Sequence, residues 1–208
     1  MDKVFELDHP LVQHHLTHLR NRETPPHIFR AQVRRLAILL AAEVTRDLPL
    51  KEKVINTPLE QMNGAVLAGR IGLVPILRAG LGMTDALLDL LPTAEVWHLG
   101  FYRDEETLQP VEYYQKFSSN PPDLVFVLDP MLATGGSAAA GIEMVKKWGA
   151  KEIRMLSIIA APEGIAHVRE KHPEVSITVC EIDRELSDTA YILPGLGDAG
   201  DRIFNTLN

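Results

Sequence analysis

One stretch of this chain decides its fold, Asp129-Pro130-Met131-Leu132-Ala133-Thr134-Gly135-Gly136-Ser137. It follows the apolar run Leu124-Val125-Phe126-Val127-Leu128, whose length and bulky side chains predict a buried strand. A helical pattern comes next and ends near Trp148. The order is therefore a strand, an acid, a glycine-containing loop and a helix. In open α/β sheets that order is typical of a ligand site beyond the end of a strand.

The residue types in this loop favour a phosphorylated sugar. The start of a helix offers unpaired N–H groups and a partial positive charge, which suit a phosphate. The glycines allow a close approach of the main chain, Thr134 and Ser137 add hydroxyl donors, and Asp129 can accept hydrogen bonds from sugar hydroxyls. No lysine follows the glycines and no G-x-G-x-x-G spacing occurs, so neither common nucleotide loop is supported. The alternative is an ordinary strand-to-helix turn with Ser137 as the N-cap.

Composition narrows the class of protein. The chain has 208 residues, 46% of them apolar, which suits a single domain with a sizeable core. Its net charge of −7 argues against general nucleic-acid binding. Cys180 is alone and cannot form an internal disulfide, and no apolar run reaches the roughly 20 residues of a membrane helix. The amino terminus does not read as a signal peptide, so we expect a soluble cytoplasmic protein.

Strands and helices alternate along the chain, which predicts an α/β fold with a mostly parallel sheet covered on both faces. The expected strands are 72–77, 95–102, 110–117, 124–128, 153–160 and 175–182, with an edge strand at 51–57. Arg78, Arg103 and Asp129 all follow or end predicted strands, so their loops should meet at one crevice. Before them, Thr24 is the expected cap of a helix whose apolar stripe runs from Phe29 to Val44.

The tail breaks this alternation with Tyr191-Ile192-Leu193-Pro194-Gly195-Leu196-Gly197-Asp198-Ala199-Gly200-Asp201-Arg202. It mixes bulky apolar residues with three glycines and a proline. We interpret it as a structured loop whose main chain approaches a ligand, with a plain glycine-rich exit loop as the alternative.

Four stretches together resemble the uracil phosphoribosyltransferase family. They are Val74 to Gly80, Phe101 to Thr107, Asp129 to Ser137, and Tyr191 to Arg202, in the family's order. The resemblance implies a type I phosphoribosyltransferase-like sheet flanked by helices, with a β-hairpin flap and a C-terminal base-binding hood. It implies one domain over residues 1–208, with an amino-terminal helical arm at about 1–48 and a uracil-binding loop at about 183–203. Related folds usually begin the sugar loop with two acids, whereas here Pro130 takes the second place, as in the uracil branch.

The resemblance also implies an activity and roles for residues. The expected reaction is a glycosyl transfer from 5-phospho-α-D-ribose 1-diphosphate to uracil, giving UMP and diphosphate in pyrimidine salvage. Asp129, Arg78 and Arg103 carry over as the catalytic residues, the two arginines gripping diphosphate. The other sugar-phosphate residues are Pro130, Met131, Leu132, Ala133, Thr134, Gly135, Gly136, Ser137 and Asp198. The uracil residues are Ile192, Gly197, Asp198 and Ala199.

Cofactor and partners follow from the same resemblance. Mg²⁺ is expected, held mainly by substrate and water rather than by a protein cage. The segment from Arg103 to Gln115 is the expected flap. A homodimer or larger homo-oligomer is expected, with the amino-terminal helices as candidates for the contact, and GTP is a candidate activator. Transfer to another nucleobase, a regulatory RNA-binding protein on the same fold, and a nucleotide-binding module that does no catalysis remain alternatives.

Overall fold

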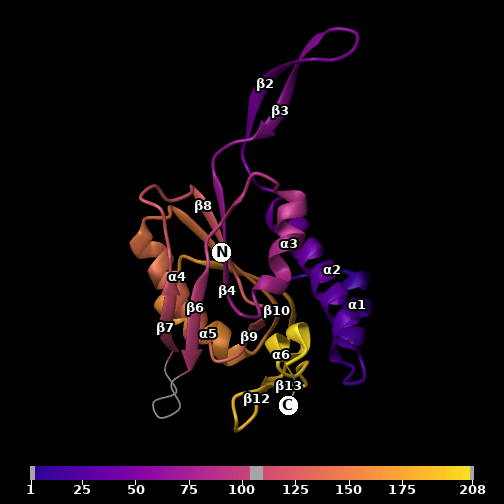
Figure 1. Cartoon of the computed structure of the whole chain (residues 1–208), viewed down its shortest axis with the longest axis vertical. Helices are drawn as coiled ribbons and strands as arrows, with labels where there is room; N and C mark the ends of the chain where they lie inside the picture. Colours follow the sequence, from indigo (N-terminus) through magenta and orange to yellow (C-terminus); the bar gives the residue numbers. More distant parts are fainter. Residues whose placement is uncertain (1–2, 104–109, 207–208) are drawn as a thin grey trace.

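The computed structural model describes residues 3–103 and 110–206, with side chains described outside 102–112. Within these residues, nine strands form one sheet in the order β1-β11-β10-β8-β4-β6-β7, with β5 beside β4 and β9 beside β10 (Figure 1). The path is parallel except for the antiparallel pair β6–β7. The strands are β1 (Val4–Glu6), β4 (Ile71–Leu77), β5 (Glu95–Val96), β6 (Leu99–Arg103), β7 (Pro110–Gln115), β8 (Leu124–Leu128), β9 (Met131–Leu132), β10 (Glu152–Ala160) and β11 (Ser176–Ile182).

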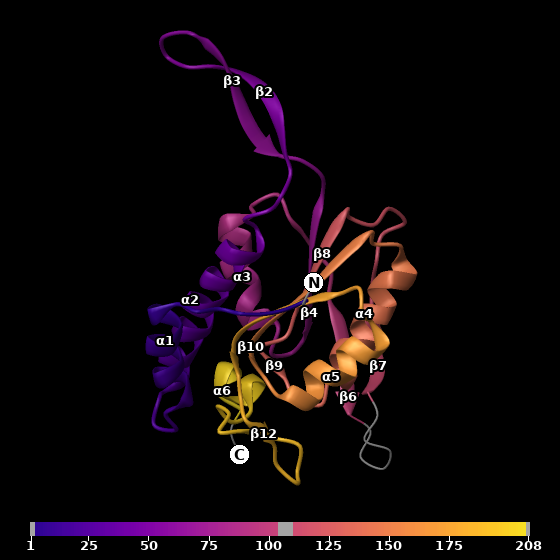
Figure 2. The ribbon, with the colours of Figure 1, turned by 180° about the vertical axis from the view of Figure 1, so that it is seen from behind.

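Helices cover both faces of this sheet, as Figures 1 and 2 show from opposite sides. One face carries α1 (Pro10–Arg20), α2 (Pro26–Val44) and α3 (Leu81–Leu90), which share a core with the apolar side chains of β4, β8 and β10. The other face carries α4 (Gly136–Trp148) and α5 (Pro162–Lys171) over a second core. Because helices cover both faces of the sheet, the central strands are apolar throughout and do not alternate between apolar and polar residues.

The amino-terminal helices pack their apolar faces against the sheet and against each other. The apolar stripe of α2 is buried within the chain, from Phe29 at 0% exposure to Val44 at 6%. The stripe is therefore part of the core of the chain, and a contact between copies through these helices would have to use their outer faces. The expected cap was also wrong: Pro25 occupies the N-cap position of α2, and the Thr24 hydroxyl instead donates to the carbonyl of His18 at 2.6 Å. Two consecutive prolines supply fixed φ angles, so this helix begins without a side-chain cap.

A two-stranded hairpin projects from the sheet, formed by β2 (Leu50–Asn56) and β3 (Gln61–Leu67) (Figures 1 and 2). The prediction of an edge strand at 51–57 was wrong in this respect, because β2 pairs only with β3 in the described residues. Every residue of β2 is exposed, and Leu59 at the tip is 95% exposed. The expected strand at 95–102 is likewise divided, since Trp97 and His98 separate β5 from β6.

The end of the chain folds back over the carboxyl ends of the strands. It contains the short pair β12 (Glu185–Leu186) and β13 (Ile192–Leu193), followed by α6 (Ala199–Phe204) (Figure 1). The prediction of a structured tail is confirmed, because Ile192, Leu196, Ala199 and Ile203 are all buried. Throughout residues 3–103 and 110–206, every helix is too short or too polar to cross a lipid bilayer.

Candidate functional site

The order of the central strands fixes where a ligand would bind. From β4 the chain passes to β6 on one side of it, and then to β8 on its other side, before moving on to β10 and β11. The connections therefore diverge between β4 and β8, and ligands bind at such a point beyond the carboxyl ends of the strands. Arg78 directly follows β4 and Asp129 directly follows β8. The predicted convergence of these two residues is confirmed.

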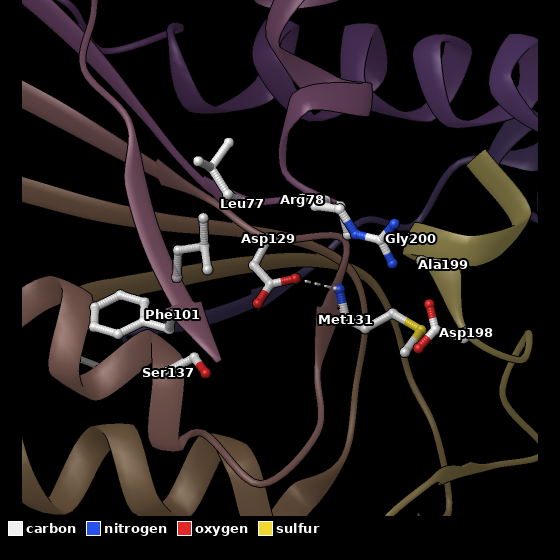
Figure 3. A pocket seen from close by; sticks show the side chains of 11 residues that line it. Leu77, Arg78, Phe101, Asp129, Met131, Ser137, Asp198, Ala199 and Gly200 are labelled. Atoms are coloured by element: carbon white, nitrogen blue, oxygen red, sulfur yellow. Dashed lines mark hydrogen bonds between the residues drawn. The ribbon is translucent and has the colours of Figure 1, made fainter. Parts of the chain in front are cut away.

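A cavity of about 240 Å³ opens at this point (Figure 3). Its charged and hydroxyl side chains come from three segments: the end of β4, the Asp129 loop (residues 129–137), and the C-terminal loop (residues 192–199) with the start of α6. Phe101 of β6 adds an aromatic side chain to the lining. In Figure 3, Asp129 lies between Ser137 and Phe101 on one side and Arg78 and Asp198 on the other. The lining residues are Ile76, Leu77, Arg78, Ala79, Phe101, Asp129, Met131, Ser137, Asp198, Ala199 and Gly200.

Asp129 is the most electrostatically perturbed carboxyl of the site. One of its oxygens accepts a hydrogen bond from the N–H of Met131 at 3.2 Å. Burial raises its pKa to about 7, the Met131 N–H opposes this, and the nearby carboxylate of Asp198 adds to the rise. Asp129 therefore exchanges its proton near neutral pH, and a cationic ligand or metal ion beside it would favour the ionised form.

The Asp129 loop is shaped by close main-chain contacts. Gly135 has a φ of +79°, and a Cβ there would lie 2.7 Å from the carbonyl oxygen of Gly164. A Cβ on Gly164 would in turn lie 2.2 Å from the carbonyl oxygen of Ala133. The loop thus lies directly on the first turn of α5, and only glycines permit this approach.

The start of α4 differs from the simple turn considered above. Gly135 in the left-handed conformation is the N-cap, without a side-chain cap bond, and Ser137 lies inside the helix. Ser137 is therefore not the N-cap, and its side chain is one of those that line the cavity. Of the N–H groups expected to face a phosphate, that of Ala133 already donates to the carbonyl of Met131 at 3.1 Å. The N–H groups of the first turn of α4 remain the best placed.

Arg78 reaches across the cavity to the last helix. Its guanidinium donates to Asp201 at 3.0 Å, and Asp201 also accepts from the hydroxyl of Thr206 at 2.7 Å. The Arg78 side chain is 55% exposed, so it remains accessible to an anion. Gly80 lets this turn pack against β8, since a Cβ there would lie 2.4 Å from the carbonyl oxygen of Leu128. Asp201 and Thr206 were not expected at the site, and only the spacing of Asp201 three residues after Asp198 could have suggested them.

Only some of the remaining predicted residues line the cavity. Asp198 and Ala199 line the cavity, whereas Ile192 is buried in the core and Gly197 is not part of the lining. Among the loop residues, Met131 and Ser137 line it, whereas the others build the loop behind it: Pro130, Leu132, Ala133, Thr134, Gly135 and Gly136. Arg103 ends β6, but its side chain falls outside those described, and the flap residues 104–109 lie outside the described chain.

Metal-binding capacity rests on two carboxylates. Asp129 and Asp198 both line the cavity, and carboxylate oxygen is the donor that Mg²⁺ prefers. Among the described residues, no three or more His, Cys, Asp or Glu side chains are arranged to hold a metal ion. The donor set thus fits a metal that arrives with further oxygen ligands from a substrate.

Known proteins with similar sequences cover the whole chain. A family model described as uracil phosphoribosyltransferase matches residues 6–206. A protein of that name from Roseiflexus castenholzii is 57% identical over 210 residues, covering 99% of this chain and 100% of the relative. One from Bacillus cereus is 53% identical over 208 residues with the same coverage.

Solved structures agree at the level of the fold. The AQ2163 protein from Aquifex aeolicus is 37% identical, covers 97% of each chain and superposes with a TM-score of 0.92. An adenine phosphoribosyl transferase from Trypanosoma brucei, 14% identical, covers 95% of this chain and 89% of its own, with a TM-score of 0.58. The expected type I phosphoribosyltransferase fold is confirmed. From the family match and these relatives, the chain belongs to the uracil phosphoribosyltransferase family and is a phosphoribosyltransferase enzyme.

Proposed function

We propose that this protein transfers the phosphoribosyl group of 5-phospho-α-D-ribose 1-diphosphate to N1 of uracil, giving UMP and diphosphate. The observation that carries the proposal is the meeting of three segments at one cavity. Asp129 comes from one segment, Arg78 from another, and Asp198 with Ala199 from the third. They offer an acceptor for ribose hydroxyls, a cation for diphosphate, and main-chain groups for a base.

The charges of the reaction match the charges of this cavity. When the bond between C1 and the diphosphate oxygen breaks, positive charge develops on the ribose and negative charge on the diphosphate. The guanidinium of Arg78 faces the leaving group, while the carboxylates of Asp129 and Asp198 lie on the ribose side. The bond from C1 to uracil N1 forms as N1 loses its proton to solvent or to a neighbouring group. Arg103 is proposed as a second diphosphate ligand from the end of β6.

The 5-phosphate is assigned to the first turn of α4. The helix there is 13 residues long, so its N-terminus carries a substantial partial positive charge. The hydroxyls of Thr134 and Ser137 would add donors. Mg²⁺, when bound with the diphosphate, would neutralise its charge, and Asp129 and Asp198 are the carboxylates available to its hydration shell.

Uracil is proposed to bind against the C-terminal loop. Uracil presents two carbonyls and one N–H along a fixed edge, which a stiff main chain can match. Cytosine has a different donor pattern and would leave buried polar groups unpaired, so it should be rejected strongly.

The direct test is formation of UMP from uracil, the activated sugar and Mg²⁺, measured with and without GTP. Uracil should be converted, and adenine, hypoxanthine and cytosine should not compete with it. Turnover of another base in preference to uracil would contradict the proposal. A shift of RNA mobility at physiological salt without catalysis would favour the regulatory alternative. Binding of the sugar diphosphate without diphosphate release on adding uracil would favour a non-catalytic module.

We also propose a homo-oligomer, with the β2–β3 hairpin as its contact. An isolated two-stranded hairpin is only marginally stable in water, and this one exposes Leu50, Val54 and Leu59. Covering it with a second copy would remove that surface from water. The double variant Val54→Glu and Leu59→Glu should therefore lower the mass measured by light scattering in gel filtration. Leu90→Glu, at an exposed leucine outside the hairpin, is the control.

A further inference from the structure

Arg202 of α6 is a buried cation that is bonded to main-chain carbonyls. Only 8% of the residue is exposed. Its guanidinium donates to the carbonyls of Leu19 at 2.6 Å, Leu196 at 2.6 Å and Asn21 at 2.7 Å. It also lies 4.3 Å over the ring centroid of Phe29. In the part of the chain that the structure describes, Arg202 has no carboxylate within ion-pair distance, so its charge is held by carbonyl dipoles.

Burying such a cation is unfavourable unless its hydrogen bonds are nearly all satisfied. The three carbonyls belong to two segments, the end of α1 with the turn after it, and the C-terminal loop. Arg202 therefore joins the C-terminal loop to α1 at a fixed distance. A guanidinium can do this because its donors form a rigid planar fork.

A second anchor holds the neighbouring residue of the same loop. The Asp183 side chain, 2% exposed, accepts from both terminal nitrogens of Arg20 and from the N–H of Gly195 at 2.9 Å. Arg20 also donates to the carbonyl of Gly195 at 2.9 Å. Both main-chain groups of Gly195 are thus bonded to one buried ion pair. Gly195 has a φ of +66°, and a Cβ there would lie 2.1 Å from the carbonyl of Ile192, so the turn itself needs glycine.

The two anchors act on adjacent residues just before the cavity. Gly195 and Leu196 face the scaffold, and two residues later Asp198 and Ala199 line the cavity. Asp198 is itself fixed as the N-cap of α6, accepting from the N–H of Asp201 at 2.9 Å. The loop is therefore fixed at Gly195 and Leu196 by the two anchors and at Asp198 by the start of α6.

We propose that Arg202, Arg20 and Asp183 are positioning residues. By holding the C-terminal loop in place, they set its affinity for the base. This inference rests on the proposed function, because it requires the loop to bind uracil. Hydrogen bonds need donor–acceptor distances of about 2.7–3.2 Å and weaken steeply when the groups lose their alignment. Releasing Gly195 or Leu196 would therefore weaken base binding more than binding of the sugar diphosphate. The sugar contacts lie mainly on the Asp129 loop and Arg78, and Asp198, which also serves the sugar, is held separately as the N-cap of α6.

The test compares Arg202→Ala with a matched arginine elsewhere. Arg154 has a side chain only 14% exposed and bonds to the carbonyl of Val44 and to Asp47 and Glu152, away from the cavity. Steady-state kinetics of UMP formation should show KM for uracil raised about tenfold in Arg202→Ala, the loss of roughly one hydrogen bond. KM for the sugar diphosphate should change less than about threefold. Arg154→Ala should lower the melting temperature and leave both KM values unchanged.

Rescue separates positioning from general destabilisation. Millimolar guanidinium should fill the space left in Arg202→Ala and lower its KM for uracil, whereas the same concentration of urea should not. Arg202→Lys should lie between wild type and Arg202→Ala. If Arg202→Ala does not fold, Arg20→Met, at a more exposed arginine, should show the same selective rise in KM for uracil.

Equal rises in both KM values, or a fall in melting temperature with neither KM changed, would overturn the proposal. Failure of the proposed function looks different. In that case the wild type would not convert uracil, and the same ratio of KM values would be measured with whichever base it does convert.

Discussion

The Asp129 loop and the C-terminal loop face each other across one cavity, yet they are held in opposite ways. The Asp129 loop continues from β8 into α4, and its shape comes from its own glycines and from the adjacent first turn of α5. The C-terminal loop depends on Arg20 and on Asn21, residues about 175 positions away along the chain. A loop for phosphate can be built locally, because helix starts offer N–H groups wherever they occur. The C-terminal loop, proposed to bind the base, is instead placed by residues far away along the chain.

The largest effect should come from the charged groups between the two loops. Asp129→Asn preserves shape but removes the charge proposed to face the ribose, and Arg78→Ala removes the cation proposed to face diphosphate. Each should lower kcat/KM by about 10²–10³-fold, as loss of a transition-state contact does. Circular dichroism should show both variants folded. Near-normal turnover in both would remove the catalytic roles assigned to these residues.

A substitution at Gly164 should disturb the Asp129 loop, which is held by nearby residues, without disturbing the C-terminal loop, which is held by distant ones. Gly164→Ala would place a Cβ 2.2 Å from the carbonyl of Ala133 and push the Asp129 loop away from α5. We expect a loss of about 1–3 kcal/mol in the free energy of unfolding and a higher KM for the sugar diphosphate, with KM for uracil little changed. This is the reverse of the pattern expected for Arg202→Ala.

The control for that change is Gly141→Ala in α4. A Cβ there meets side chains only at 3.4 Å or more, which is ordinary contact. Alanine in a helix is favoured over glycine, so this variant should be as stable as the wild type or slightly more stable. Urea unfolding and initial-rate kinetics measure both quantities. A Gly164→Ala variant that raised KM for uracil instead would contradict the separation of the two loops.

The same contrast explains what the sequence could predict. The Asp129 loop is contiguous, so its acid, glycines and helix start were all visible, and the residues that line the cavity from it were among those expected. The anchors of the C-terminal loop form no motif, because Arg20 meets Asp183, and Arg202 meets the end of α1, only after folding. The structure contradicts the alternative of a simple turn capped by Ser137, since the N-cap of α4 is Gly135 in the left-handed conformation. Pairing of the 50–56 strand with its neighbour outside the sheet also has no local signal.

A pH experiment should probe the buried carboxyl of the Asp129 loop. Its pKa is raised to about 7, while an unfolded aspartate has a pKa near 4. Between about pH 4 and pH 7 the folded protein therefore keeps a proton that the unfolded chain has lost. The free energy of unfolding should fall as pH rises through this window. Asp129→Asn lacks this contribution, so the difference in stability between variant and wild type should grow from pH 4 to pH 7.

Activity should follow the ionised form of Asp129. The kcat/KM for the sugar diphosphate should rise as pH passes about 7 and then level off, because only the carboxylate can accept from both ribose hydroxyls. The Asp129→Asn profile should lack this rise. Parallel stability curves for wild type and variant would show that Asp129 ionises at its ordinary pKa.

The smallest effect is expected at the pair formed by Arg78 and Asp201, which joins the end of β4 to the last helix. Asp201 competes with diphosphate for the guanidinium, but the pair is partly exposed and its energy is small. Asp201→Asn keeps an oxygen acceptor for Thr206 and removes the competing charge. KM for the sugar diphosphate should fall about twofold, with KM for uracil unchanged, and the difference should shrink at high salt because exposed charges are screened. Thr206→Val, which removes the hydroxyl and its long 3.5 Å bond from Arg78 but leaves the ion pair, is the matched variant and should leave KM for the sugar diphosphate within error. A rise in KM for the sugar diphosphate in Asp201→Asn would instead mean that Asp201 orients Arg78 for its ligand, and the last helix would then support both sides of the cavity.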